Sequence, residues 1–473
     1  MMKTGFGLAA AAATLALSAW AGDARAAGVY FSDRGVRPMG RAGAYVAGAD
    51  DLGSIWYNPA GLADAGTSVL VDFGYLHFQD AYTRQLAIPD AEGTIHHVNS
   101  PTVNGGAPFL PVPTMAWSLK LDSKERFTIA GGFLEPQVAL GSYPSTVDGQ
   151  PSSSRYSLGS YDGSILGVLG GWVAWKPLKQ LRFGFGVLGL MGQFVTNVTF
   201  STCPAVRLVC APEQPEFDAN SRITVGPFLA PTVNGGVTWV PWSALRFGIS
   251  GQGPMVVSSD AKLQIQLPTD VAFDSAKVNG SDAHVTFTLP AIFRAGVEVR
   301  PLKTLRLEAA YVREFWSEHQ TITASPNGMT ITGVNGLPPS ITVPNIVFPR
   351  HFQDAASYRL GGEYNFRVGG FGVDARLGAS YEESAVPAGY VSLLSLDMSK
   401  VTLSMGGSLH VGDHWRFDFL YAHLFCNSVY VSPSQAMIPH INPINGNAPL
   451  EPVNGGTYTA EADLIGLGVN YKF

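Results

Sequence analysis

The sequence predicts an all-β membrane protein, a fourteen-stranded antiparallel transmembrane β-barrel that follows a separate N-terminal segment. Apolar and polar residues alternate from about residue 66 to the end, and short turns alternate with long loops. Hydrophobic residues make up 46% of the chain and charged residues 14%, yet beyond the N-terminal stretch no run of 18 apolar residues occurs. Strands with one face in lipid produce this balance, whereas a membrane-spanning helix needs a long apolar run.

The first 26 residues have the features of a secretory signal peptide. Lys3 supplies a positive charge, residues 6–21 are apolar, and Ala24-Arg25-Ala26 provides the small residues of a cleavage site. Such a segment is removed, here after Ala26. Export excludes the cytoplasm, and together with the alternation it predicts the bacterial outer membrane as the location.

The alternating segments are long enough to cross a membrane. The odd positions from Val285 to Val299 are apolar, while the even positions include His284, Arg294 and Glu298. Residues 415–426 alternate in the same way. A transmembrane strand needs about 9–11 residues, so these segments can cross a bilayer and protrude from it.

A short motif recurs between the alternating segments. Residues 177–182 (sequence PLKQLR) are repeated at 241–246 and 301–306, and more loosely at 411–416. Each copy is predicted to form a hairpin turn, because proline can end a strand where no ladder N–H is needed. In membrane barrels short turns face the periplasm and long loops face outward. The long, Pro- and Gly-rich connections are 80–112, 141–157, 201–220, 267–282, 321–353 and 431–457.

The alternating segments number fourteen. An even number of strands lets both chain termini lie on the periplasmic side. The chain ends in an alternating stretch with a terminal aromatic, Phe473. This end resembles the C-terminal signal read by barrel-assembly machinery, which is therefore an expected partner. The predicted strands are 66–80, 113–121, 125–140, 158–176, 180–200, 221–240, 244–266, 283–301, 304–320, 354–366, 370–384, 397–411, 414–430 and 458–473.

Charge and cysteine content exclude some functions. The net charge is −6 and no basic stripe occurs, so nothing indicates nucleic-acid binding. Cys203 and Cys210 lie in a Pro-rich loop, where an exported protein can form a local disulfide or keep two unpaired thiols. Cys426 is predicted to be an ordinary strand residue.

Residues 27–65 are rich in Gly and Ala and do not alternate, so they lie either in the periplasm or inside the barrel as a plug. They contain Gly40-Arg41-Ala42-Gly43-Ala44, Ala49-Asp50-Asp51 and Trp56-Tyr57-Asn58-Pro59-Ala60-Gly61-Leu62. This segment resembles the hatch of the FadL/TodX family of outer-membrane transport proteins for hydrophobic compounds. The resemblance continues at Glu135-Pro136, Leu140-Gly141-Ser142-Tyr143-Pro144, Leu289-Pro290-Ala291, Phe293-Arg294-Ala295-Gly296 and residues 381–387 (YEESAVP).

The resemblance implies a signal peptide (1–26), a hatch (27–65) and a barrel (66–473), with Asn58, Pro59, Ala60 and Gly61 as the central hatch motif. It implies a monomeric channel, without cofactor, for long-chain fatty acids or hydrocarbons that diffuse passively past the hatch. The channel would be surrounded by outer-membrane lipid and lipopolysaccharide. A kink in the third strand would give a lateral opening toward the membrane.

Gly131, Gly132 and Phe133 are the candidates for that kink, because glycine inside a strand weakens pairing and permits a bulge. The alternative is that the two glycines simply face the hatch.

The resemblance also implies an inner ligand site touched by the mature N-terminus, at Ala27, Gly28, Val29, Tyr30 and Phe31. These residues are small, apolar or aromatic, so they can enter an apolar lumen without burying an unpaired carboxylate. The alternative is a disordered periplasmic tail, as chain termini often are.

Other motifs are weaker. Residues 184–189 (GFGVLG) match a dinucleotide fingerprint by letter but lie inside an alternating strand, so they are interpreted as small lumen-facing residues. Adjacent His96 and His97 point apart and predict no metal site, and Ser250 lacks the turn of a hydrolase nucleophile. The charged lumen candidates are expected to tie the walls to the hatch, with a ligand-carboxylate site as the alternative: Arg182, Arg246, Arg294, Glu298, Arg306, Glu308, Glu314, Arg416 and Asp418.

Three functions follow from these observations. A channel for hydrophobic molecules is favoured by the hatch motif. A general diffusion porin for small polar solutes is the alternative, and it would not need a Gly- and Ala-rich plug. A barrel enzyme is disfavoured, because the sequence shows no paired nucleophile and base.

Overall fold

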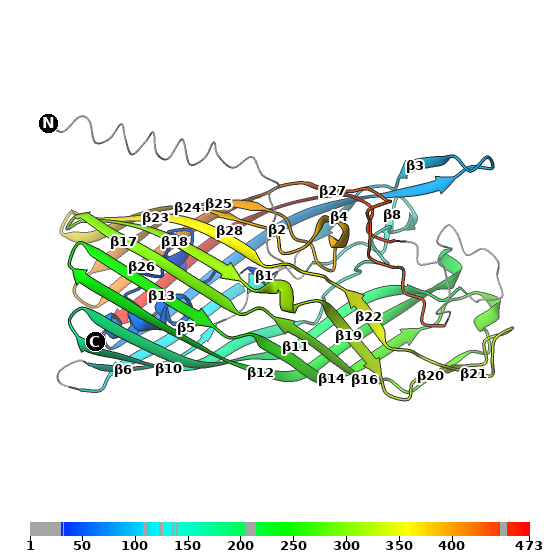
Figure 1. The fold of residues 1–473 in the computed structure, drawn as a ribbon, viewed down its shortest axis with the longest axis horizontal. Coiled ribbons are helices and arrows are strands. Elements are labelled where there is room, and N and C mark those ends of the chain that lie inside the picture. The colour runs from blue at the N-terminus through cyan, green and yellow to red at the C-terminus, as the bar shows by residue number, and fades with distance from the viewer. Residues whose placement is uncertain are drawn as a thin grey trace.

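A computed structural model of the chain describes residues 30–31, 33–106, 111–122, 126–134, 137–138, 141–203, 214–444 and 452–473. These residues form a closed antiparallel barrel with fourteen wall positions (Figure 1). The first wall strand, β2 (Ser68–Pro89), pairs with the last, β28 (Gly456–Lys472), and thereby closes the ring. The predicted strand number and the predicted closing strands are confirmed.

Each wall position follows its neighbour in sequence. The order is β2, β5 (Pro111–Lys120), β6 (Phe127–Leu134), β10 (Ile165–Leu178), β11 (Leu181–Ser201), β12 (Asp218–Trp242), β13 (Leu245–Gln252) with β14 (Met255–Gln266), β17 (Ile292–Leu302) with β16 (Asp282–Leu289), β18 (Leu305–Glu314) with β19 (Thr321–Pro326), β23 (Ala355–Val368) with β22 (Ile346–Pro349), β24 (Phe371–Glu382), β25 (Lys400–Val411), β26 (Trp415–Cys426) and β28.

The two ends of the barrel differ as the turn repeat predicts. The four copies of the motif join β10 to β11, β12 to β13, β17 to β18 and β25 to β26. These turns and the C-terminus gather at one end, on the left in Figure 1, and the long loops lie at the other. The left end is therefore the periplasmic end. The loop end carries β3 (Ile95–Asn99), β4 (Val103–Gly106), β8 (Thr146–Val147), β9 (Gln150–Pro151), β15 (Lys277–Asn279), β20 (Thr330–Thr332), β21 (Ser340–Thr342), β27 (Val429–Val431) and the 3-10 turns η2 (Pro215–Phe217), η3 (Val271–Phe273) and η5 (Ala388–Tyr390).

Outward positions on the periplasmic half of the wall are apolar and exposed. On β11 they include Phe185 and Val187, and on β12 they include Val233 and Trp239. The residues between them are buried in the lumen. This belt of exposed apolar side chains is the surface that lipid covers.

Several predicted strand boundaries are wrong at the extracellular half. The predicted strands 244–266 and 283–301 are interrupted at residues 253–254 and 290–291, and the predicted strand 304–320 ends at Glu314. Gaps at residues 315–320 and 350–354 separate β18 from β19 and β22 from β23. Pro254 and Pro290 have no N–H to donate to a ladder, which favours the first two breaks. The breaks lie side by side, since Gln252 pairs with Ile292 and Ile292 with Glu314. We call this line of interruptions the seam.

Two more predicted strands are shorter than expected. The third wall strand, predicted as 125–140, is β6 and ends at Leu134. The fourth, predicted as 158–176, is β10 and begins only at Ile165. Before β10, Leu158 and Tyr161 are buried in the lumen, whereas Asp162 and Gly163 are exposed.

Cys203 is disulfide-bonded, so the alternative of an unpaired thiol at this position is wrong. Its predicted partner, Cys210, lies outside the described residues. Cys426, at the end of β26, is a free cysteine. No helix in the described part of the chain is long and apolar enough to span a membrane.

Candidate functional site: the plugged lumen

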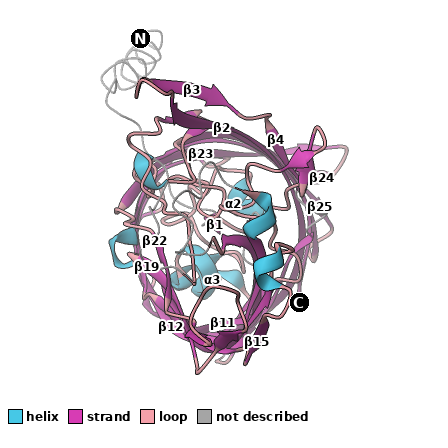
Figure 2. Ribbon diagram, turned by 90° about the vertical axis from the view of Figure 1, so that its right-hand side faces the viewer, coloured by secondary structure: helices cyan, strands magenta, loops and turns pink. Residues whose placement is uncertain are grey.

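Residues 33–65 lie inside the barrel, as Figure 2 shows from the loop end. They form only short turns of helix, α2 (Val36–Met39), α3 (Ser54–Tyr57), η1 (Pro59–Gly61) and α4 (Leu62–Ala65). The many glycines and Pro38 prevent longer helices. Almost all of these side chains are buried, so the segment fills the periplasmic half of the lumen.

Asn58 holds the central turn of this plug. Its side-chain oxygen accepts a hydrogen bond from the backbone N–H of Ala60 at 3.2 Å and so caps η1, which Pro59 begins. Its amide nitrogen donates to the carbonyl of Val46 at 2.8 Å and to the hydroxyl of Thr238 on β12 at 3.0 Å. One buried side chain thus joins two parts of the plug to the wall.

Glycines on the wall let this turn approach the backbone of the strands. A Cβ at Gly184 would lie 2.1 Å from the carbonyl carbon of Pro59, and one at Gly236 would lie 2.2 Å from Oδ1 of Asn58. In the plug, a Cβ at Gly61 would lie 2.6 Å from the carbonyl oxygen of Ala49. Gly184 and Gly186 of the string GFGVLG thus face the lumen, as interpreted from the sequence, whereas Gly189 lies beside the exposed Leu229.

Charged wall residues meet backbone and side-chain groups of the plug. The carboxylate of Glu308 accepts hydrogen bonds from the N–H groups of Val46, Ala47 and Gly48 at 2.7, 2.8 and 3.0 Å. It also pairs with Arg41 at 2.9 Å. Such a carboxylate holds three consecutive backbone donors that no helix satisfies.

Arginines of the wall hold the acidic residues of the plug. Asp50 pairs with Arg306 at 2.8 Å, and Asp51 pairs with Arg416 at 2.7 Å. Arg37 of the plug contacts both acids, at 2.6 and 3.1 Å. The other wall–plug pairs in the described residues are Lys176 with Asp64, Arg182 with Asp64, Arg246 with Asp64, Arg41 with Glu298, Arg37 with Glu363, and Arg359 with Asp33.

The arginine partners keep the two acidic residues of the plug, Asp50 and Asp51, ionised. Burial alone would raise the pKa of Asp51, but Arg37 and Arg416 outweigh it and lower the pKa to about 2. Burial also opposes ionisation of Asp50, and Arg306 and Arg37 still hold its pKa far below the usual range. Both acids are therefore charged at neutral pH, and each charge is tied to an arginine.

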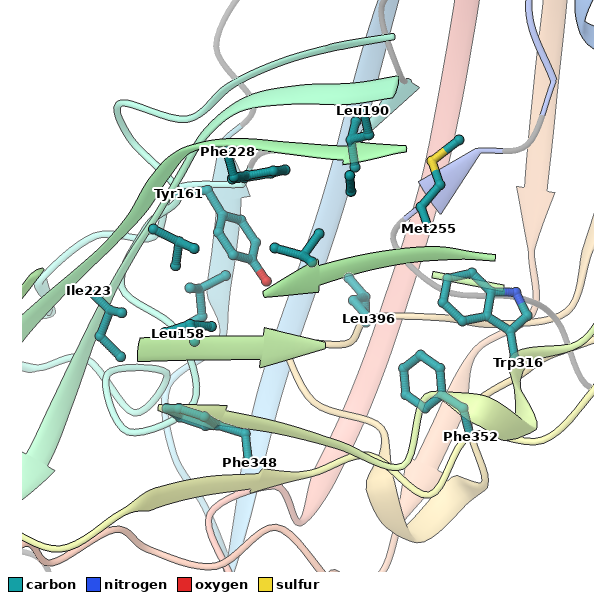
Figure 3. Close-up of a cluster of buried hydrophobic side chains, with 14 of the residues drawn as sticks. Leu158, Tyr161, Leu190, Ile223, Phe228, Met255, Trp316, Phe348, Phe352 and Leu396 are labelled. Atoms are coloured by element: carbon teal, nitrogen blue, oxygen red, sulfur yellow. The ribbon is translucent and has the colours of Figure 1, made fainter. Parts of the chain in front are cut away.

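The inward-facing residues change from charged to apolar between the periplasmic end of the lumen and its extracellular half. On β11 the inward positions run from Arg182, bonded to Asp64 at 2.7 Å, through Gly184 against Pro59, to buried Leu188 and Leu190. Above the plug the lumen is filled by an apolar cluster, which Figure 3 shows in close-up. Its labelled members are Leu158, Tyr161, Leu190, Ile223, Phe228, Met255, Trp316, Phe348, Phe352 and Leu396.

The seam contributes an arginine to this cluster. Arg350 follows β22, is buried, and its guanidinium makes no hydrogen bond to any described residue. It lies close enough to Tyr161 and His319 to affect their ionisation. Burial lowers the pKa of Arg350 to about 10, and burial together with this charge lowers the pKa of His319 to about 4. At neutral pH the cluster thus holds a cation that has no ion-pair partner among the described residues, beside a neutral imidazole.

Arg294 is a second buried guanidinium without a hydrogen bond to the described residues. Its carbon lies 5.6 Å from the ring centre of Trp56 in the plug. Among the charged residues predicted to face the lumen, Arg294 thus differs from Arg182, Arg246, Arg306 and Arg416, which bond to the plug. Glu314 bonds to Trp316 at 2.7 Å, and Asp418 to Arg416 at 2.9 Å.

The predicted inner ligand residues are described only in part. Tyr30 and Phe31 form β1 (Tyr30–Phe31), which pairs with β7 (Gln137–Val138), so backbone partners are Tyr30 with Val138 and Phe31 with Gln137. Ala27, Gly28 and Val29 lie outside the described residues. The N-terminal end of the described chain thus meets the segment that follows β6.

The third strand keeps its register through the glycines proposed for a kink. Gly131, Gly132 and Phe133 pair with β10 without a shift, and the pairing ends at Leu134. A Cβ at Gly132 would lie 3.2 Å from Cδ1 of Ile55 in the plug. Gly132 therefore faces the plug, and the strand leaves the wall beyond the glycines.

The weaker motifs have structural surroundings. Ser250 donates a hydrogen bond to the carbonyl of Tyr57 at 2.5 Å and so ties β13 to the plug. His96 lies on the exposed β3, with Asp90 at 2.8 Å. In the described residues no group of three or more His, Cys, Asp or Glu is placed to bind a metal ion.

A plug held in a closed barrel, with an apolar filling above it, defines an outer-membrane transport barrel. The chain belongs to the outer membrane protein transport family (OMPP1/FadL/TodX), whose model matches residues 17–473. It is a multi-pass β-barrel of the bacterial outer membrane and transports hydrophobic compounds, as its family does.

Solved structures share this fold. A Pseudomonas aeruginosa FadL homologue superposes with a TM-score of 0.72 at 14% identity, over 94% of this chain and 100% of that one. The Ralstonia pickettii toluene transporter TbuX has a TM-score of 0.59 at 16% identity, over 93% and 99%. The P. putida toluene transporter TodX has a TM-score of 0.58 at 13% identity, over 92% and 98%. No curated protein sequence matches the chain.

Proposed function

We propose that this barrel takes up long-chain fatty acids or hydrocarbons by passive diffusion, and that residues 27–65 act as the hatch. The main support is the apolar cluster directly above the plug. A hydrophobic molecule gains about 0.8 kcal/mol for each CH₂ that it buries there instead of in water. Movement of the plug then gates the path inward.

A conductance measurement separates this function from that of a general diffusion porin. The described plug fills the periplasmic half of the lumen and is tied to the wall by paired charges. In planar bilayers we expect almost no steady ion current at neutral pH. A large, permanently open conductance would contradict the proposal.

We propose further that the preferred ligand carries a carboxylate. Arg350 is buried in the apolar cluster, charged, and without a hydrogen bond to the described residues. A buried cation is costly unless an anion neutralises it. A fatty acid would bring that anion together with an apolar chain, which a neutral hydrocarbon cannot do.

The variant Arg350→Gln tests the ligand class. Loss of a charge-assisted hydrogen bond of about 1.5–3 kcal/mol weakens fatty-acid binding roughly ten- to a hundredfold. Binding of an alkane of equal chain length should change little. Arg313→Gln, which removes an arginine paired with Asp354 on the outer face, is the matched control. Equal fatty-acid affinity in wild type and Arg350→Gln would contradict the carboxylate site but not the channel.

The N-terminus and the third strand are proposed to act together. The support is that β6 leaves the wall after Leu134 while β1 pairs with β7 just beyond it. We propose that the lateral opening lies between β5 and β10 at this height. Deleting residues 27–31 should abolish uptake while the barrel still assembles. Unchanged uptake would mean that these residues are only a tail.

A further inference from the structure

A cavity of about 810 Å³, lined by both polar and apolar residues, lies against the extracellular half of β11, β12 and β14. Its other wall is the loop between β6 and β10, including Ser145, Arg155 and Asp162. Cavities of roughly 300–1,000 Å³ bind small ligands in other proteins.

Strand register places six side chains of this cavity on the outer face, and five of them are at least partly exposed, whereas Thr199 is buried. Asn197 pairs with Arg222 and Arg222 with Gln264, while Thr199 pairs with Asn220 and Asn220 with Gln266. Their neighbours Val198, Ser221 and Leu263 are buried. The six residues therefore form two rows across three strands, pointing away from the lumen.

These rows lie just above the lipid-facing belt. Ile165, at the top of that belt, is 74% exposed and pairs with Gln193. Asn197 is four residues further along β11, which is about 13 Å at 3.3 Å per residue. The cavity therefore faces the layer just outside the acyl chains, where lipopolysaccharide carries its sugars.

The lining suits a sugar better than an apolar or a purely anionic ligand. Serine, threonine, asparagine and glutamine provide both donors and acceptors, as the hydroxyl groups of a sugar do. Arg155 and Arg222 are offset by Asp162 and Asp218, so the cavity has no net charge from these four residues. The hydroxyl and amide residues that line it are Ser142, Ser145, Ser154, Ser160, Asn197, Thr199, Asn220, Ser221, Gln264, Gln266 and Thr269.

One side of the cavity is fixed and the other has free hydrogen-bonding capacity. Arg155 bonds to Asp218 at 2.6 Å and to the carbonyl of Ser152 at 2.9 Å, which holds the loop against β12. Arg222 makes only two hydrogen bonds within the described residues, both long, at 3.5 and 3.4 Å. The side chains of Gln264 and Gln266 make none to the described residues.

We propose that this cavity binds the glycan of lipopolysaccharide in the outer leaflet, through Arg222, Asn220, Gln264 and Gln266. The bound sugars brace the loop that continues from β6 and so steady the wall near the end of that strand. The four proposed sugar contacts lie on strand positions that point away from the apolar cluster, whereas Tyr143 and Val198 line the cavity and also belong to that cluster.

The test uses the full mature barrel in detergent and completely deacylated lipopolysaccharide as the probe. We expect saturable binding that weakens at least tenfold in the double variant Arg222→Gln/Gln264→Ala. Lys262→Gln is the matched control, because Lys262 lies on the same outer face of β14, paired with Asp282, and does not line the cavity. A heat-modifiability assay and fatty-acid binding show that each variant is folded and that its lumen is intact.

Three results would overturn the proposal. The first is that intact lipopolysaccharide binds but the deacylated probe does not, which would mean that only acyl chains are recognised. The second is that the double variant binds the deacylated probe as tightly as the wild type does. The third is that the Lys262→Gln control weakens binding as much as the double variant does, which would mean that the interaction is a general charge effect.

Discussion

Single residues decide how closely the plug fits the wall. Gly236 and Gly235 are adjacent on β12 but face opposite sides. A Cβ at Gly236 would lie 2.2 Å from Asn58, whereas the nearest atom to a Cβ at Gly235 is 3.6 Å away. This pair offers one substitution that disturbs the plug and one that does not.

We expect Gly236→Val to displace the central turn of the plug, at a cost of about 1–3 kcal/mol for overpacking. The displaced plug should leak ions, so single-channel current in planar bilayers should rise. Gly235→Val should leave the current at the wild-type level. Equal behaviour of the two variants would contradict the role given to the contact with Asn58.

Some residues of the plugged lumen could be predicted from the sequence, and others could not. The place of Asn58 in the plug could be predicted from its motif, and the contacts of the wall arginines with the plug could be predicted from the alternation of the strands. Arg350 could not, because it lies in a segment with no alternation and its burial results from the seam. Glu363 and Arg376, which bond at 2.6 Å inside the lumen, fitted the alternation but had no motif to single them out.

At the scale of elements, the plug is docked by charge more than by helix packing. Its helices are four residues long or shorter, and isolated helices of that length are unstable. Its position therefore depends on pairs such as Asp51 with Arg37 and Arg416. This dependence makes the position of the plug sensitive to acid.

The sign of the pH effect follows from the pKa of Asp51. Arg37 and Arg416 lower it to about 2, below the ordinary value of 3.8. The contribution of this charge to docking is therefore complete above about pH 4, declines as pH falls, and is lost below about pH 2. We expect channel current to increase over that range and to be unchanged between pH 5 and 7. A constant current down to pH 2 would contradict docking by this acid.

The boundaries of elements could be predicted well at the periplasmic half and poorly at the other. Turns such as residues 177–182 recur and end strands with proline, so their positions were clear. At the extracellular half, Leu158, Tyr161 and Trp316 lie outside the strands and are buried in the lumen. Local alternation cannot show that, because the burial of Leu158 and Trp316 depends on distant strands.

At the scale of the whole molecule, Phe473 is a large aromatic residue whose side chain is exposed beside the closing strands β2 and β28. Phe473 is 70% exposed, although its backbone N–H donates to the carbonyl of Thr67 at 3.0 Å. Its side chain therefore adds little to the finished barrel. We propose that it serves the assembly machinery instead.

Removing Phe473 should reduce the amount of heat-modifiable barrel in the outer membrane several-fold. The same variant refolded in detergent should unfold within about 0.5 kcal/mol of wild type, as exposed residues generally do. Lys303→Gln, at an exposed periplasmic turn, serves as the control for both measurements. Normal assembly without Phe473 would leave the residue with no such role.

The seam also gives the wall a mechanical property. When a strand is pulled out of a barrel, its inter-strand hydrogen bonds break one after another along the strand. Where the hydrogen-bond ladder is interrupted, unfolding can pause. The seventh to tenth wall positions each contain such a break, whereas β24, β25, β26 and β28 run without one. When the barrel is drawn out of a membrane from its C-terminus, the last strands should each yield in one step of force. The tenth to seventh should each yield in two, so the force trace would record the seam directly.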